Sequence, residues 1–139
     1  MIHRLDFADR VRSFVGTPFV HRGRSPGVGL DCAGVVVCAL HDYGIESPDI
    51  RYGTLPSPVD IEEGLGAIAD RIAVEERRVG DVLTMHVKGR GEIHMGVIVG
   101  KDDTGQDLLV HPSRRARIIE QPLTCGLEVA GCWRLRGVV

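Results

Sequence analysis

The segment CAGVVVCALHDYG (residues 32–44) restricts the possible folds most, because it is apolar on nearly every side. Its valines favour a strand, whereas its length, the preceding Asp31 and the closing Gly44 favour a helix. We interpret the segment as a helix. One continuous face of that helix would carry Val35, Val36, Ala39, Leu40 and Tyr43. A helix that is apolar on more than one side has to be buried, so the rest of the chain must surround it.

Two amphipathic helices are predicted on either side of this segment. The first runs from Asp6, its cap, to Val15, and its apolar stripe consists of Phe7, Val11, Phe14 and Val15. The glycine-rich stretch GTPFVHRGRSPGVGLD (16–31) that follows reads as a long ordered loop. The other helix spans Pro58 to Ile72, with Ser57 as its cap. Its apolar face consists of Ile61, Leu65, Ile68 and Ile72.

From Gly80 onward the sequence changes to short strand-like runs. They are divided by glycine, aspartate and proline, as is typical of an antiparallel sheet. The runs are DVLTMHV, HMGVIVG, DLLVHP, ARIIE and EVAGCWRLR. Helices first and strands second predict an α+β fold. A chain of 139 residues suffices for one core, so we expect a single domain over residues 1–139.

Charge and hydropathy argue against several classes of protein. The formal net charge of −2 argues against a general nucleic-acid binder. No apolar run approaches the roughly 20 residues that span a bilayer, so no membrane insertion is expected. The N-terminal stretch MIHRLDFADRVRSF lacks the apolar core of a signal peptide. We therefore expect the chain to be cytoplasmic when it is synthesised.

The four cysteines show no CxxC spacing, so no metal or other cofactor is expected, and metal analysis would test a zinc site. Cys38, Cys125 and Cys132 are interpreted as small buried apolar residues. Cys32 has a different setting, because a glycine-rich loop delivers it to the first turn of the buried helix. Free backbone N–H groups and the helix dipole there favour a thiolate and can stabilise an oxyanion. Gly34 would leave room for a substrate beside the sulfur.

A cysteine nucleophile needs a general base, and histidine is the usual one. His41 lies about 13 Å along the same helix and is too far from Cys32. His94 opens one strand-like run and His111 closes the next, so a hairpin would place them side by side. A lone strand histidine is more often a surface or core residue, but the loop–cysteine–helix segment favours catalysis. We expect Cys32, His94 and His111 to act together, with His111 fixing the tautomer of His94.

The chain resembles the NlpC family of bacterial and phage cell-wall cysteine peptidases, which have a compact papain-like fold. Family members carry a G-x-P-Y loop, which matches Gly16-Thr17-Pro18-Phe19. Their D-C-S-G-L-V motif at the start of the central helix matches Asp31-Cys32-Ala33-Gly34-Val35-Val36. A later G-D matches Gly80-Asp81, the H-x-G-I/V of the general base matches His94-Met95-Gly96-Val97, and the third polar residue matches His111. The match covers nearly the whole chain.

The resemblance implies hydrolysis of a peptide bond in the peptidoglycan stem, commonly between D-glutamate and a diamino acid. It also implies that the residues at positions 19, 31 and 33 contact the substrate. Asp31 would hold the free amine of the substrate, and it can also simply cap the helix. The family tyrosine is Phe19 here and the family serine is Ala33, so two polar groups of the usual substrate clamp are missing.

The sequence of the segment HRGRSPGVGLDCAG (residues 21–34) resembles that of small phage and gene-transfer-agent members of the family. It implies that phage-tail proteins are partners and that a virion or tail particle carries the enzyme to the wall. The cluster Arg114, Arg115 and Arg117 after His111 is by default a solvated face. Its functional alternative is a basic rim that attracts the carboxylates of a stem peptide.

Two alternatives to a cell-wall peptidase stay open at this point. The first is a structural tail-assembly component that keeps the fold without useful catalysis, and Phe19 and Ala33 are its support. The second keeps the Cys–His chemistry but uses it as an amidase or acyltransferase on another substrate, since a fold does not fix a function.

Overall fold

The structure, a computed structural model, describes residues 1–53, 57–87, 93–113, 117–123 and 127–139. Its helices are α1 (Arg4–Arg12), α2 (Cys32–Asp42), α3 (Pro58–Ile68) and the 3-10 helix η1 (Val74–Glu76). Its strands are β1 (Arg24–Ser25), β2 (Gly29–Leu30), β3 (Ala69–Ile72), β4 (Val82–Val87), β5 (Ile93–Lys101), β6 (Asp107–Pro112), β7 (Ile118–Pro122) and β8 (Leu127–Leu135). The predicted α+β class is confirmed.

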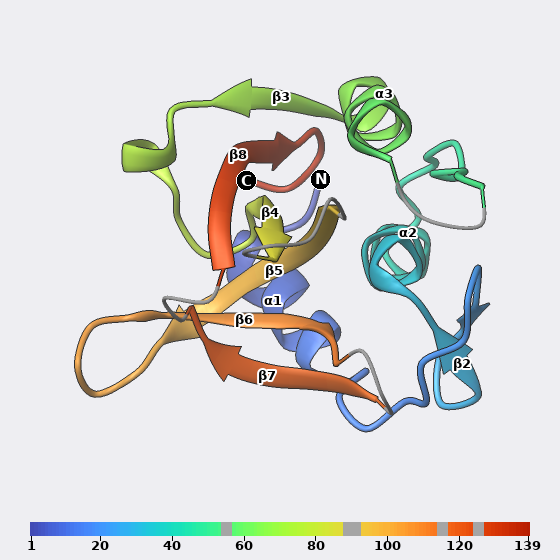
Figure 1. The fold of residues 1–139 in the computed structure, drawn as a ribbon, viewed down its shortest axis with the longest axis horizontal. Helices are drawn as coiled ribbons and strands as arrows, with labels where there is room; N and C mark the ends of the chain where they lie inside the picture. Colours follow the sequence, from blue (N-terminus) through green and yellow to red (C-terminus); the bar gives the residue numbers. More distant parts are fainter. Residues whose placement is uncertain (54–56, 88–92, 114–116, 124–126) are drawn as a thin grey trace.

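A six-stranded antiparallel sheet forms the larger half of the molecule (Figure 1). Its strand order is β3-β8-β4-β5-β6-β7, so neighbouring strands are mostly joined by short connections. All five predicted strand-like runs after Gly80 are strands of this sheet. Figure 1 shows the start of β5 and the end of β6 on the side of the sheet nearest to α2.

Helix α2 is buried over all but its last two residues, as its sequence predicts. Every residue from Cys32 to Leu40 is buried, which the hydrophobic effect strongly favours for so apolar a segment. Asp31 is the N-cap, and its side chain accepts a hydrogen bond from the Gly34 N–H. The valines do not divert the segment into a strand, because α1, the sheet and the preceding loop surround it on several sides.

Helix α1 differs from its prediction at both ends. It begins at Arg4, and His3 caps it by accepting from the Leu5 N–H, so Asp6 lies in the first turn instead. It ends at Arg12, and Val15 is exposed rather than part of the buried stripe. The remaining predicted stripe residues, Phe7, Val11 and Phe14, are buried.

The third predicted helix is correct at its start but too long at its end. Ser57 caps α3 and accepts from the Asp60 N–H, as expected. The helix ends at Ile68, however, and residues 69–72 form β3, which pairs with β8 from Ala69↔Leu135 to Ile72↔Cys132. Local apolar spacing continues the helix to Ile72, whereas the edge of the sheet offers backbone partners that the sequence pattern does not reveal.

The core has two parts, one on each face of the sheet. Helices α1 and α2 pack on one face, and the odd-numbered residues of β5, such as Ile93, Met95 and Val97, point into that part. A smaller cluster on the other face consists of Leu83, Met85, Ile98, Leu109 and Cys132. The chain termini meet next to each other: Ile2 N–H donates to the Gly137 carbonyl (2.7 Å) and Val139 N–H donates to the Ile2 carbonyl (2.8 Å).

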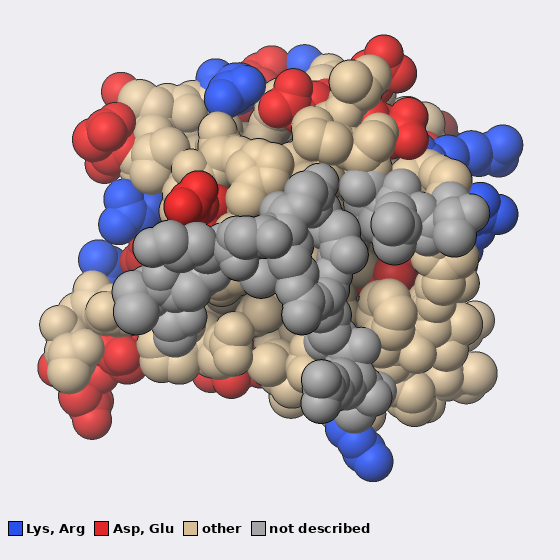
Figure 2. Space-filling model, viewed as in Figure 1, with Lys and Arg blue, Asp and Glu red and all other residues tan. Residues whose placement is uncertain are grey.

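Figure 2 shows basic and acidic side chains interspersed over the described part of the visible face. No broad basic surface forms there. Among the residues that the structure describes, no helix is long and apolar enough to cross a membrane.

Candidate active site

The start of α2 is fixed by a buried carboxylate. Asp31 is completely buried, and its Oδ1 accepts from the Gly34 N–H and from Arg24 Nη1, both at 2.7 Å. Its Oδ2 accepts from the Arg22 N–H at 2.9 Å and from the Tyr52 hydroxyl. The charge is therefore compensated by a buried ion pair and three further hydrogen bonds. Groups from three chain segments thus meet at the residue that precedes Cys32.

Gly34 serves close packing rather than substrate access. A Cβ atom added there would overlap the carbonyl oxygen of Gly23 and lie 3.1 Å from the Leu30 side chain. The glycine lets the loop approach the first turn of α2, which differs from the expectation that it leaves room beside the sulfur. The loop itself is shaped by Arg22, the one described non-glycine residue with a left-handed backbone (φ 60°), whose N–H donates to Asp31.

Cys32 lies against the start of β5. Its sulfur accepts a hydrogen bond from the backbone N–H of Met95, the residue next to His94. Burial, and then the charge of Asp31, raise the pKa of the Cys32 thiol to about 12, although the N–H groups of Met95 and Ala33 act in the opposite direction. The side chain is 5% exposed. Burial of the sulfur therefore favours the thiol over the thiolate, against the effect expected of the helix start.

His94 and His111 lie together, as the hairpin prediction required. Strands β5 and β6 pair antiparallel, with Val97 opposite Val110, and a Cβ on Gly96 would lie 3.5 Å from the His111 Cβ. Both imidazoles line one pocket of about 190 Å³. The absence of a side chain at Gly96 leaves His111 space beside the strand that carries His94.

His111 is held in a neutral state by its surroundings. Burial, and then the charge of His94, lower the pKa of His111 to about 4. Its Nε2 lies 2.7 Å from Nε2 of Gln121 on β7. With the amide N–H donating, His111 Nε2 is the acceptor and its proton is on Nδ1. Gln121 therefore sets the tautomer of the histidine that was expected to orient His94.

The low pKa of His111 predicts a loss of stability in mild acid. The unfolded chain binds a proton near pH 6.5 and the folded chain only near pH 4, so unfolding gains protons as the pH falls through this window. From pH 7 to pH 5 this group alone should lower the free energy of unfolding by roughly 2 kcal/mol. Urea unfolding at both pH values of the wild type and of His111→Asn measures it. An equal pH dependence in the two proteins would contradict the prediction.

Of the three residues expected to contact substrate, only Phe19 is accessible to solvent. Phe19 is 39% exposed and forms an isolated bridge with Leu30, next to the nucleophile loop. Asp31 and Ala33 are fully buried. The Asp31 oxygens are already occupied by protein donors. Arg117 is exposed, whereas Arg114, Arg115 and Cys125 lie outside the described residues.

Three residues of the site escaped the sequence interpretation: Arg24, Tyr52 and Gln121. Arg24 and Tyr52 reach Asp31 from the loop before α2 and from the segment after it. Gln121 is recognised only from the β6–β7 register, in which it lies opposite Leu109, on the same strand face as His111.

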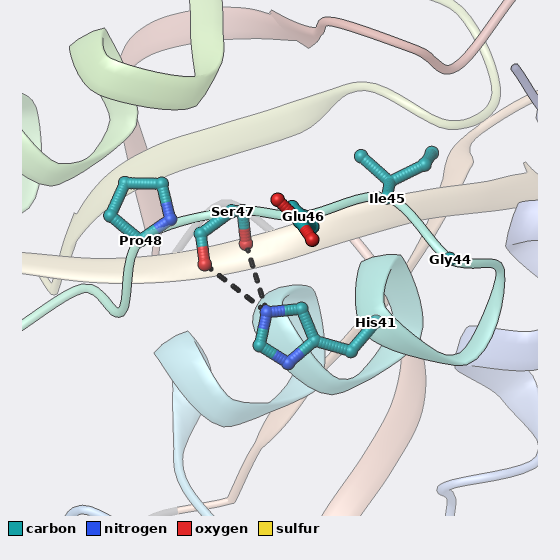
Figure 3. Close-up of a pocket in the computed structure, with 6 residues that line it drawn as sticks. All are labelled: His41, Gly44, Ile45, Glu46, Ser47 and Pro48. Carbon is teal, nitrogen blue, oxygen red and sulfur yellow. Dashed lines mark hydrogen bonds between the residues drawn. The ribbon is translucent and has the colours of Figure 1, made fainter.

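A larger pocket lies away from this chemistry, at the far end of α2 (Figure 3). It has a volume of about 760 Å³ and is lined by His41, Gly44, Ile45, Glu46, Ser47 and Pro48. His41 Nε2 lies 3.1 Å from the Ser47 carbonyl oxygen and 3.5 Å from its hydroxyl. These contacts secure the turn after α2. Among the described residues, no group of three or more His, Cys, Asp or Glu side chains could hold a metal ion.

A thiol at the start of a buried helix, next to a strand that carries a histidine, is the arrangement of a cysteine hydrolase. The sequence model of the NlpC/P60 family matches residues 16–126. The chain belongs to this family, whose members are generally cell-wall peptidases. No curated protein sequence matches the chain significantly.

Solved structures share the fold. A lipoprotein-like NLP/P60 family protein of Staphylococcus aureus has a TM-score of 0.65 at 19% identity, and the match covers 95% of this chain and 41% of that one. NlpC2 of Trichomonas vaginalis has a TM-score of 0.69 at 19% identity, with 95% and 46% covered. An NlpC/P60 family protein of Bacillus cereus has a TM-score of 0.63 at 24% identity, with 92% and 40% covered. This chain thus spans less than half the length of these structures.

Proposed function

We propose that this protein is a cysteine peptidase that hydrolyses a peptide bond of the peptidoglycan stem, between D-glutamate and a diamino acid. The observation that carries the proposal is the position of Cys32, at the start of α2 and hydrogen-bonded to β5 one residue from His94. Family membership supports the choice of substrate. The neighbouring His111 supports the catalytic role of His94, since the two imidazoles share one pocket.

The high pKa of the thiol determines the order of the proton transfers. In the proposed mechanism, the Cys32 proton moves to His94 while the sulfur attacks the substrate carbonyl carbon, because burial of the sulfur favours the thiol in the free protein. The N–H groups at the start of α2 stabilise the resulting oxyanion. His94 then gives its proton to the leaving amine, which leaves a thioester on Cys32. A water molecule that loses a proton to His94 hydrolyses the thioester and restores the thiol.

His111 acts through His94 and not on the substrate. A neutral His111 next to His94 can fix the orientation of the His94 ring without competing for its proton. The low pKa of His111 supports this role, because the ring stays neutral over the working range. Phe19 is the accessible residue that would contact the substrate, whereas the buried Asp31 and Ala33 would hold the first turn of α2 in position.

Cleavage of defined stem peptides tests this proposal. We expect the purified protein to convert a D-glutamyl–diamino acid peptide into two fragments, identified by mass, one of which ends at the glutamate. A short tetrapeptide and a whole muropeptide should both be cut at this bond. Intact peptides after prolonged incubation with a well-folded protein would contradict the proposal and favour a structural role. Carriage by a phage tail or gene-transfer-agent particle remains a prediction from the sequence.

A further inference from the structure

A second pocket lies beside the nucleophile loop. It has a volume of about 390 Å³ and is lined by Arg22, Arg24, Asp49, Ile50, Arg51 and Tyr52. The loop before α2 forms one of its walls, and the segment between α2 and α3 forms the other. Most of its lining residues are charged, although the chain as a whole carries a net charge of only −2.

The pocket is connected to the catalytic region through Tyr52. This side chain is buried, its hydroxyl donates to Asp31, and its ring makes an edge contact with His21 at 5.4 Å between centroids. Asp31 directly precedes Cys32 and caps the helix that carries it, so the Tyr52 hydroxyl is one hydrogen bond from the nucleophile segment. The pocket and the start of α2 thus share Tyr52 and Arg24, which line the pocket and bind Asp31.

The charges of the pocket do not cancel. Arg24 Nε pairs with Asp49 (2.8 Å) and its Nη1 pairs with Asp31 (2.7 Å), while its Nη2 donates to the Ile50 carbonyl. One guanidinium thus serves two carboxylates, and with Arg22 and Arg51 the three arginines and two aspartates leave a net charge of +1. Within the part of the chain that the structure describes, neither Arg22 nor Arg51 takes part in an ion pair, and both are exposed. Two guanidinium groups are left to attract an anion.

The same contacts argue against an amine in this position. Both Asp31 oxygens are occupied by four donors from the protein, and the residue is fully buried. A substrate ammonium group would have to displace Arg24 or Tyr52 and would also meet the positive charges of Arg22 and Arg51. We propose, on the basis of the function proposed above, that this pocket binds a carboxylate of the stem peptide through Arg22 and Arg51.

A γ-linked D-glutamate keeps its α-carboxylate free, and the diamino acid carries a carboxylate of its own. The test uses the full-length Cys32→Ala protein, which cannot turn over, and isothermal titration with two peptide pairs. In each pair, one of these carboxylates is either free or amidated. We expect the free acid to bind about tenfold more tightly than the amide in at least one pair, the usual effect of a charged hydrogen-bonded contact.

Arg22→Gln and Arg51→Gln, each added to Cys32→Ala, should reduce this preference to about twofold or less. Arg78→Gln, a change of another exposed arginine in the turn before β4, is the matched control and should leave the preference unchanged. Equal binding of acid and amide in both pairs, no binding of any peptide, or a preference that survives both arginine changes would overturn the proposal.

Different results would contradict the anion pocket and the proposed peptidase activity. If the wild-type protein cleaves the peptides but shows no dependence on Arg22, Arg51 or a carboxylate, only the anion pocket is wrong. If the wild type cleaves none of them, the peptidase proposal is wrong, whatever the titrations show. Because both arginines are exposed, an unchanged urea midpoint in each variant confirms that lost binding does not result from unfolding.

Discussion

Replacing Cys32 with alanine is expected to lower the rate of stem-peptide hydrolysis by about 10⁴-fold or more, because the nucleophile of a covalent mechanism has no substitute. The fold should persist, since removal of one small buried sulfur costs only about 1 kcal/mol. The measurement is the initial rate of product formation by mass spectrometry, together with the urea midpoint.

Cys38→Ala is the matched control, because this cysteine lies on the same helix and is similarly buried. Its thiol donates to the Arg24 carbonyl at 3.3 Å, whereas the Cys32 sulfur is hydrogen-bonded to Met95 on β5. We expect near wild-type rates from this variant. Substantial hydrolysis by Cys32→Ala would rule out Cys32 as the nucleophile, and an equal loss in both variants would indicate a packing effect.

Replacing Asp31 with alanine is expected to lower the free energy of unfolding by about 3–5 kcal/mol. The change removes the cap of α2, leaves the buried Tyr52 hydroxyl without its acceptor and takes one of two carboxylate partners from Arg24. Urea unfolding at pH 7 measures the loss. Activity should fall as well, because the first turn of α2 positions Cys32.

The variant Asp49→Ala is the control, because it removes an exposed carboxylate that pairs with the same arginine as the buried Asp31. Asp49 pairs with the same arginine at 2.8 Å, but its side chain is 40% exposed, whereas that of Asp31 is 0% exposed. We expect a loss of about 1 kcal/mol or less, since exposed ion pairs contribute little. Similar losses for the two variants would show that burial of Asp31 does not determine its contribution.

The parts of the fold that the sequence predicts are those with a local cause. Asp31, the apolar run after it and Gly44 define α2 without knowledge of any other segment. Turn residues divide the later strands, so the hairpin that brings His94 to His111 was also predictable. Each of these features depends on residues that are neighbours in the sequence.

The remaining features depend on contacts between distant segments. Residues 69–72 continue a helical pattern, yet they pair with β8, which comes some sixty residues later. Tyr52 and Arg24 show no motif, and their role follows only from their meeting at Asp31. The pKa of Cys32 likewise reflects burial by the whole core, which outweighs the local effect of the helix start.

The neighbouring chain termini have a consequence for how such a unit can be used. Because Ile2 and Val139 are hydrogen-bonded to each other, two partner sequences fused to the two ends would emerge side by side. The domain could therefore be inserted into a surface loop of a host protein with little separation of the two halves of that loop. The two ends of the fold thus provide a single point of attachment to a host protein.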